Sequence, residues 1–192
     1  MKIIKSRIFK ILVALFIIGI LLGIISYIIL DSTEIDKIIK NYFIIIQKGN
    51  FNYLKALIYS LFHNYKYLII IWSSGILLFS ILLIPLLIIY RGILTSFIIS
   101  SIIALYGIKG ILYAFILLFP CILINEIIFI FTSYYSLNIT FRTINNIKNN
   151  KSINIKQYFK NYFLIFIIFL LILLLSSLFE TYISSNILNF VV

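Results

Sequence analysis

The sequence predicts an all-α fold, a polytopic membrane helical bundle of about five transmembrane helices plus two amphipathic helices in an outer loop. Composition is the first reason: 64% of the 192 residues are hydrophobic and only 11% are charged, whereas soluble domains have roughly a quarter of their residues charged. The apolar residues also gather in runs close to the 20 or so residues that a membrane helix needs. Basic residues separate these runs, as in membrane proteins. The length fits a single integral membrane domain over residues 1–192.

The predicted spans cover residues 11–30, 67–90, 93–108, 111–137 and 162–179. The first run is longer than the apolar core of a usual signal peptide, and no cleavage site of the A-x-A kind follows it. We therefore expect it to be a retained helix. The third run is the shortest, since at 1.5 Å per residue it gives about 24 Å, less than a typical hydrocarbon core. A re-entrant segment is the alternative for this run.

The distribution of basic residues favours five complete spans. With a cytoplasmic N-terminus, most of the 16 Lys and Arg residues lie on the cytoplasmic side, whereas a re-entrant third run reverses the balance. Arg91 and Lys109 then occupy short turns between spans. The C-terminus is expected to be extracytoplasmic, in the cell membrane. Cytoplasmic loops account for the net charge of +11, so we expect no nucleic-acid partner.

The segment between the first two spans shows helical periodicity. Apolar residues recur at i, i+3, i+4 and i+7 over residues 35–46 and again over 54–62, and Gly49-Asn50 separates the two stretches. Ser32 is placed to cap the first helix. Such helices either lie in the outer headgroup region, fold back on the bundle or dock an outer partner. The basic segment 138–160 is expected to be a solvated connector near anionic lipid.

Small and helix-breaking residues mark two spans. Gly19 and Gly23 form a GxxxG pattern in the first span, which allows close helix approach. The partner of this face is either another span of the chain or a second copy, so a homo-oligomer stays an alternative. Pro120 is expected to kink the fourth span.

Two acidic residues, Glu126 and Glu180, are candidates for function. Asn125 and Glu126 lie near the middle of the fourth span, and an intramembrane acid is a functional candidate by default. Glu126 either handles a proton or cation, or is a neutral acid bonded to a hydroxyl such as Thr95, Ser100 or Ser101. No second acid or base is expected at that depth. Glu180 ends the last run and is expected at the outer interface, where it meets either water or a polar partner.

Catalytic and metal sites are not expected. The chain has one His, His63, and one Cys, Cys121, so neither a cluster of metal ligands nor a nucleophile with an adjacent base is apparent. We therefore expect no enzyme activity and no cofactor.

Several stretches together resemble one known family. They are FIIGILLGIISY, HNYKYLIIIWSSGILL, IYRGILTSFIIS, LLFPCILINEIIFIF and LLSSLFETYISSNIL, in this order along nearly the whole chain. This set is similar to the stage II sporulation protein M family of small membrane proteins with about five spans. The positions that match the family pattern are Gly19, Gly23, Asn64, Trp72, Gly92, Pro120 and Glu180.

The resemblance implies a role in endospore formation. Members of this family sit in the septal membrane of sporulating cells and act as scaffolds in forespore engulfment. Their partners in the engulfment complex are membrane-anchored peptidoglycan hydrolases, and the hydrolysis belongs to those partners. A small transporter or permease subunit that uses Asn125 and Glu126 is the alternative function.

Overall fold

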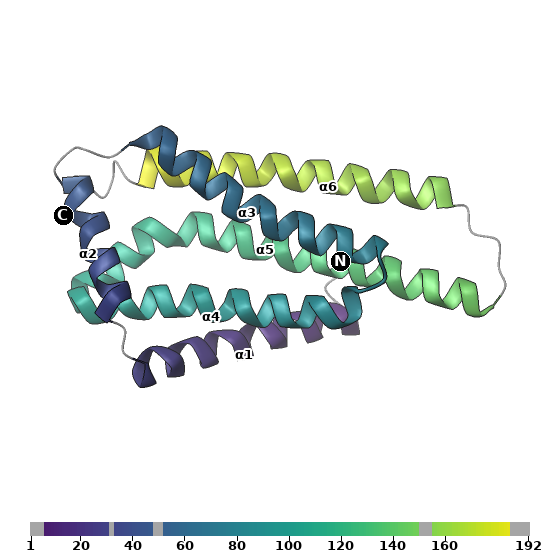
Figure 1. Ribbon diagram of the computed structural model, residues 1–192, viewed down its shortest axis with the longest axis horizontal. Coiled ribbons are helices and arrows are strands. Elements are labelled where there is room, and N and C mark those ends of the chain that lie inside the picture. Colours follow the sequence, from purple (N-terminus) through teal and green to yellow (C-terminus); the bar gives the residue numbers. More distant parts are fainter. Residues whose placement is uncertain (1–5, 31–32, 48–51, 150–154, 185–192) are drawn as a thin grey trace.

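The computed structural model of the chain describes residues 6–30, 33–47, 52–149 and 155–184, and this part is helical with no strand (Figure 1). Its helices are α1 (Arg7–Ile29), α2 (Thr33–Gln47), α3 (Tyr53–Ile76), α4 (Ser80–Tyr106), α5 (Ile108–Lys148), α6 (Ile155–Leu178) and a π-helical turn η1 (Phe179–Ser184). The prediction of an all-α fold is confirmed.

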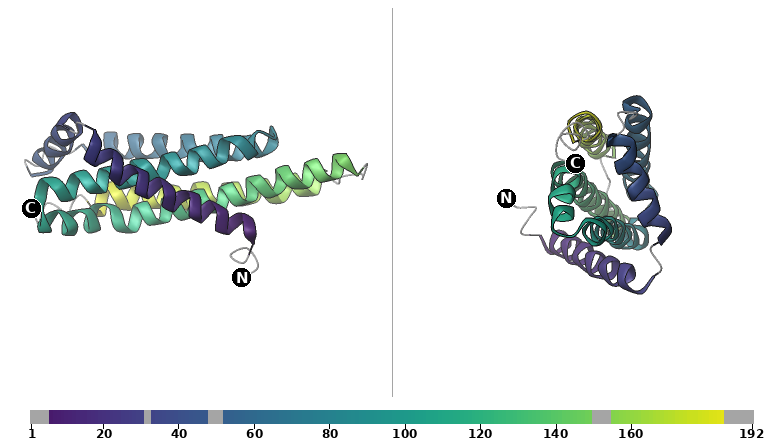
Figure 2. Two further views of the ribbon diagram at one scale, coloured as in Figure 1. Left: turned by 90° about the horizontal axis from the view of Figure 1, so that it is seen from below. Right: turned by 90° about the vertical axis from the view of Figure 1, so that its left-hand side faces the viewer.

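The long helices α1, α3, α4, α5 and α6 run side by side and alternate in direction (Figures 1 and 2). The short helix α2 lies across one end of the bundle, where α4 turns into α5 and where η1 ends. We call this the α2 end. The opposite end, where α1 begins, α3 turns into α4 and α5 leads into α6, is the hairpin end. There α5 and α6 extend beyond the other helices.

Local sequence explains where the helices begin and end. Ser6 caps α1 by accepting a hydrogen bond from the Phe9 N–H at 3.2 Å, and Asn52 caps α3 through Lys55 N–H at 3.1 Å. Gly107 separates α4 from α5 with a φ of 58°, a left-handed conformation that glycine adopts without steric cost.

The predicted boundary between the second and third spans is wrong. The structure breaks the chain at residues 77–79, where Leu78 has a φ of 62°, and α4 then runs without interruption through Arg91. The expected spans 67–90 and 93–108 are therefore replaced by α3 and α4. The sequence predicts Arg91 in a turn between spans, because charged residues usually lie outside the hydrocarbon region of the membrane. It stays inside because it has a buried partner.

Helices also extend beyond the predicted spans elsewhere. The expected loop 138–160 is largely helical, since α5 continues to Lys148 and α6 begins at Ile155. The second expected amphipathic helix, 54–62, is the first part of α3 and not a separate element. The first one corresponds to α2. Ser32, Gly49 and Asn50 lie outside the described residues.

Four helical segments of the described chain are long and apolar enough to cross a membrane. They are Arg7–Ile29, Ser80–Tyr106, Cys121–Lys148 and Lys160–Tyr182. The expected count of five is therefore not established, because α3 is missing from this set. Polar residues such as His63 and Asn64 interrupt the apolar character of α3 in its first half.

The main apolar core lies between α3, α4, α5 and α6. Leu68, Ile71, Ile84, Phe129 and Leu173 have no exposed surface. Side chains from α1, such as that of Leu12, join this core from the α4 side. In a membrane, such interdigitation stabilises helix association mainly through van der Waals contact.

Candidate functional site

The closest helix contact is the crossing of α1 and α4, where glycines face each other. A Cβ on Gly92 would lie 2.7 Å from the Phe16 carbonyl oxygen and 3.0 Å from the Cα of Gly19. A Cβ on Gly23 would lie 2.4 Å from the Ile93 carbonyl oxygen. Only glycine permits this approach, so the GxxxG face of α1 packs within the chain, against α4.

An ion pair between α4 and α5 is buried in the middle of the bundle. Arg91 donates from Nη2 to Glu126 Oε1 at 2.7 Å, and the two side chains are 9% and 4% exposed. The single hydroxyl proton of Thr95 is shared between the Arg91 carbonyl oxygen at 2.8 Å and Glu126 Oε1 at 3.3 Å. Two charges of opposite sign thus offset each other where either alone would be costly.

This central ion pair overturns part of the sequence reading of Glu126. The acid does have a hydroxyl partner, Thr95, which was one of the expected ones. It also has a basic partner at the same depth, which was not expected. Glu126 is therefore placed as a carboxylate beside a guanidinium, and the expectation of an acid without a charged partner is wrong.

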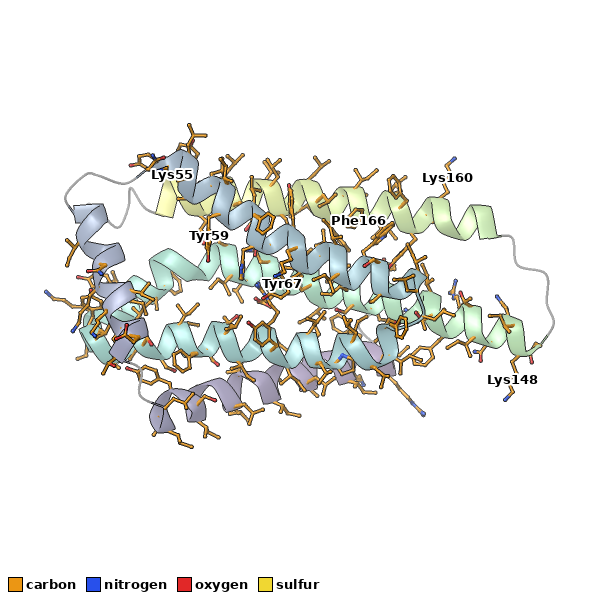
Figure 3. The ribbon with its side chains drawn as sticks, viewed as in Figure 1. Lys55, Tyr59, Tyr67, Lys148, Lys160 and Phe166 are labelled. Atoms are coloured by element: carbon orange, nitrogen blue, oxygen red, sulfur yellow. The ribbon has the colours of Figure 1, made fainter. Side chains whose placement is uncertain are left out.

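Aromatic rings complete the surroundings of Arg91. Its Cζ lies 4.4 Å from the ring centroid of Phe129 and 5.2 Å from that of Tyr67. Figure 3 labels Tyr67 about midway along the bundle. Desolvated cation–π contacts of this kind stabilise a guanidinium by about 2 kcal/mol.

A second polar cluster joins α3 to η1 near the α2 end. Ser60 Oγ donates to Glu180 Oε2 at 2.8 Å, and Ser177 Oγ lies 3.2 Å from Ser60 Oγ. Asn64 Nδ2 donates to Ser60 Oγ at 3.5 Å. Glu180 therefore has a polar partner on a neighbouring helix rather than water alone.

Glu180 lies in the π-helical turn η1. The hydroxyl of Thr181, within this turn, donates to the carbonyl oxygen of Ser177, just before the turn, at 2.9 Å. There it competes with a backbone N–H for the same carbonyl oxygen. π-Helical turns are rare and occur frequently at functional sites. Here the turn contains the residue that bonds to Ser60 of α3.

Trp72 links α3 to α6 near the hairpin end. Its ring stacks on Phe166 at a centroid distance of 4.6 Å and on Tyr162 at 5.5 Å. The Tyr162 hydroxyl donates to the Trp72 carbonyl oxygen at 2.8 Å. Aromatic pairs with such geometry stabilise a contact by roughly 1 kcal/mol beyond the area they bury.

Hydroxyl groups connect α3, α4 and α5 at the same end. Ser80 donates to Thr140 at 2.6 Å, and Thr140 donates to the Gly75 carbonyl oxygen at 3.1 Å. Ser136 donates to the Ile71 carbonyl oxygen at 2.9 Å. All three hydroxyl residues have no exposed surface, so this end of the bundle is tightly closed.

The predicted site residues thus fall into separate places. Gly19, Gly23 and Gly92 form the α1–α4 crossing, Glu126 belongs to the central ion pair, and Asn64 with Glu180 belongs to the cluster at the α2 end. Trp72 lies in the α3–α6 contact. Asn125 is buried beside Glu126. Pro120 falls within α5, but its side chain lies outside the described ones, so the kink expected there is not tested.

Sequence reasoning missed Arg91 and Ser60. Arg91 stands within IYRGILTSF, a stretch of α4 that is apolar on all sides, so no periodic pattern marks its buried face. Ser60 stands in a first half of α3 that looked extramembranous. No group of three or more His, Cys, Asp or Glu that could hold a metal is found in the part of the chain that the structure describes.

Comparison with protein-family models matches the stage II sporulation protein M model over residues 12–185. The chain belongs to this family. The match covers α1 from Leu12 onward and every later helix through η1, and with them each of the polar clusters above. No curated protein and no solved structure gave a significant match. Family membership and the apolar helices together make the chain a membrane protein of the sporulation class.

Proposed function

We propose that the chain is a non-enzymatic membrane scaffold that recruits or anchors peptidoglycan-degrading partners at the sporulation septum during forespore engulfment. The observation that carries this proposal is the use of intramembrane polar groups to join helices to one another. Arg91 is tied to Glu126, Ser60 to Glu180, and Ser80 to Thr140. Such cross-links favour a rigid bundle that presents fixed surfaces.

The proposed orientation has the N-terminus in the cytoplasm and the C-terminus outside. The hairpin end carries Arg7, Lys10, Arg142, Lys148 and Lys160, and the described part of that end has no Asp or Glu. Figure 3 shows Lys148 and Lys160 on the projecting part of α5 and α6. Cytoplasmic flanks of membrane spans are rich in Lys and Arg. In this orientation α2 and η1 face the extracytoplasmic side, where peptidoglycan lies.

Glu180 has a role in this proposal as the residue that fixes η1 on α3 at the outer end. Glu180→Gln keeps an oxygen that accepts from Ser60, whereas Glu180→Ala removes it. We expect partner recruitment to survive the first change better than the second. If both variants recruit partners as the wild type does, Glu180 has no part in the function.

The alternative function, a small transporter or permease subunit, uses Asn125 and Glu126. The geometry favours it less, because Glu126 is already neutralised by Arg91 at 2.7 Å. A transported cation would have to displace a buried guanidinium. Glu126→Gln separates the two functions, since a transporter loses flux whereas a scaffold loses stability first.

The direct test follows a fluorescent fusion of the chain through sporulation, beside a deletion strain. We expect the fusion to gather at the asymmetric septum and to co-purify with membrane-anchored peptidoglycan hydrolases. In the deletion strain, we expect engulfment to stall. A uniform distribution in the envelope together with normal spores in the deletion strain would contradict the scaffold role.

A further inference from the structure

Helix α3 has an exposed polar face that points toward the central ion pair. Tyr59, His63 and Tyr67 recur at i, i+4 and i+8, so they lie on one side of the helix. Their rings follow one another at centroid distances of 6.3 and 5.1 Å. We call these residues the α3 stripe. It is about 12 Å long, at 1.5 Å per residue.

Exposure falls along the α3 stripe from the α2 end toward the middle. Tyr59 is 75% exposed, His63 is half-buried and Tyr67 is 9% exposed. Figure 3 shows Tyr59 nearer the α2 end and Tyr67 further along α3. The stripe ends at Arg91, whose Cζ lies 5.2 Å from the Tyr67 ring. A graded polar face thus leads from one end of the bundle to the buried charges.

The buried charges have hydrogen-bonding capacity that the protein leaves open. Arg91 Nε, Glu126 Oε2 and Asn125 Oδ1 are buried and find no hydrogen-bond partner among the described residues. Buried polar atoms of this kind are costly in hydrocarbon and are commonly bridged by water. Water therefore fits the polar atoms at the end of the stripe.

The other exposed face of α3 has a different chemistry. Leu54, Ile58, Phe62 and Ile69 are 65%, 61%, 72% and 49% exposed and lie on one side of the helix. This face suits lipid chains. A lipid chain against the α3 stripe would instead leave the His63 ring nitrogens and the Tyr59 hydroxyl in hydrocarbon.

Beyond the ion pair, toward the hairpin end, the bundle is sealed. Leu68, Ile71 and Ile84 have no exposed surface, and Ser80 and Thr140 bond directly to each other there. The packed side chains of Leu68, Ile71 and Ile84 thus separate Arg91 from the hairpin end, and the hydroxyls beyond them bond to one another or to backbone carbonyls.

We infer that the α3 stripe is a one-sided water path, which connects the α2 end of the protein to the Arg91–Glu126 pair and stops there. The ligand of the site is water, which reaches the ion pair from one side of the membrane only. This inference is independent of the scaffold role, since it concerns solvent access and no partner.

Cysteine accessibility tests the water path in the full-length protein, because the chain has a single cysteine. In a Cys121→Ala background, a single cysteine replaces either His63, on the α3 stripe, or Phe62, on the apolar face. These two residues are neighbours in α3, so they lie at nearly the same depth in the membrane. The protein is held in sealed proteoliposomes, and a membrane-impermeant anionic methanethiosulfonate is added to one side at a time. Lys37→Cys on α2 and Lys148→Cys on α5 report which end of the protein faces the reagent.

We expect His63→Cys to react at least about tenfold faster than Phe62→Cys, because a thiolate forms in water and not in hydrocarbon. The reaction should occur only from the side that labels Lys37→Cys. Equal rates at both positions, fast or slow, overturn the inference. So does labelling of His63→Cys from the side of Lys148→Cys.

Folding is controlled separately. Every variant should react fully after denaturation in detergent and should elute as the wild type does in gel filtration. If Cys121→Ala fails this check, the wild-type background serves instead, since Cys121 is only 1% exposed and its slow reaction gives the baseline.

Discussion

Removing one partner of the central ion pair should destabilise the bundle far more than removing both. Arg91→Met leaves a carboxylate that is 4% exposed, and Glu126→Leu leaves a guanidinium that is 9% exposed. With charge centres about 4 Å apart and an effective dielectric constant of 20, the lost attraction is about 4 kcal/mol. Breaking buried pairs in proteins costs a similar 3 to 5 kcal/mol or so.

The double variant Arg91→Met/Glu126→Leu has no buried charge and keeps similar side-chain volume. Replacement of whole buried pairs by apolar residues is often neutral or stabilising. We therefore expect each single variant to lower the free energy of unfolding by about 4 kcal/mol, and the double variant to lower it by much less than either single variant does. For a chain of this length, 4 kcal/mol corresponds to a Tm about 10 °C lower.

The assay is thermal unfolding of the purified protein in detergent, followed by gel filtration of a fluorescent fusion. Thr95→Val is the matched control, because it removes only the 3.3 Å contact with Glu126 and the bond to the Arg91 carbonyl. It should cost about 1 kcal/mol. If the effects of the two single changes simply add in the double variant, the pair is not coupled and the reasoning is refuted.

Two further predictions concern helix contacts. Gly19→Leu places a Cβ 2.4 Å from the Ile89 carbonyl oxygen, about 1 Å inside ordinary contact, so α1 must move from α4 at a cost of at least 1 to 3 kcal/mol or so. Ala14→Leu, on the exposed side of α1, is the control and should leave the Tm unchanged. Tyr162→Phe removes the 2.8 Å bond to the Trp72 carbonyl and should cost about 1 kcal/mol, measured as a shift in Tm. Lys160→Ala is the control, because Lys160 is exposed two residues earlier in α6, and it should change stability by less than about 0.5 kcal/mol.

Composition predicted the fold class well, because apolar excess in a short chain has few other outcomes. Span boundaries were harder, since two consecutive apolar helices form one long run in the sequence. The turn at residues 77–79 contains Leu and Phe and no glycine or proline, and the nearest turn-forming residue, Gly75, still lies inside α3. The charge of Arg91 led to the wrong boundary, because a charged residue inside an apolar run usually indicates the end of a membrane span.

The candidate site was predictable residue by residue but not as an arrangement. The spacing of glycines such as Gly19 indicates close helix packing, and an acid in an apolar run, such as Glu126, indicates a candidate functional residue. Their partners come from distant parts of the chain: Arg91 is 35 residues from Glu126, and Ser60 is 120 residues from Glu180. Only the fold brings such pairs together.

The position of Arg91 also accounts for the polar groups on the side of α3 that faces the centre of the bundle. A buried ion pair in a membrane must lie beside groups that tolerate charge, and the residues of α3 that approach it are Tyr67 and, further out, His63. Both side chains bring polar groups to this side of α3. They are therefore among the residues that make α3 hard to recognise as a span, and they also lie beside the charged pair at the centre of the bundle. If Arg91 and Glu126 were both apolar, Tyr67 and His63 would no longer lie beside a buried charge, and apolar residues would fit on this side of α3 as well.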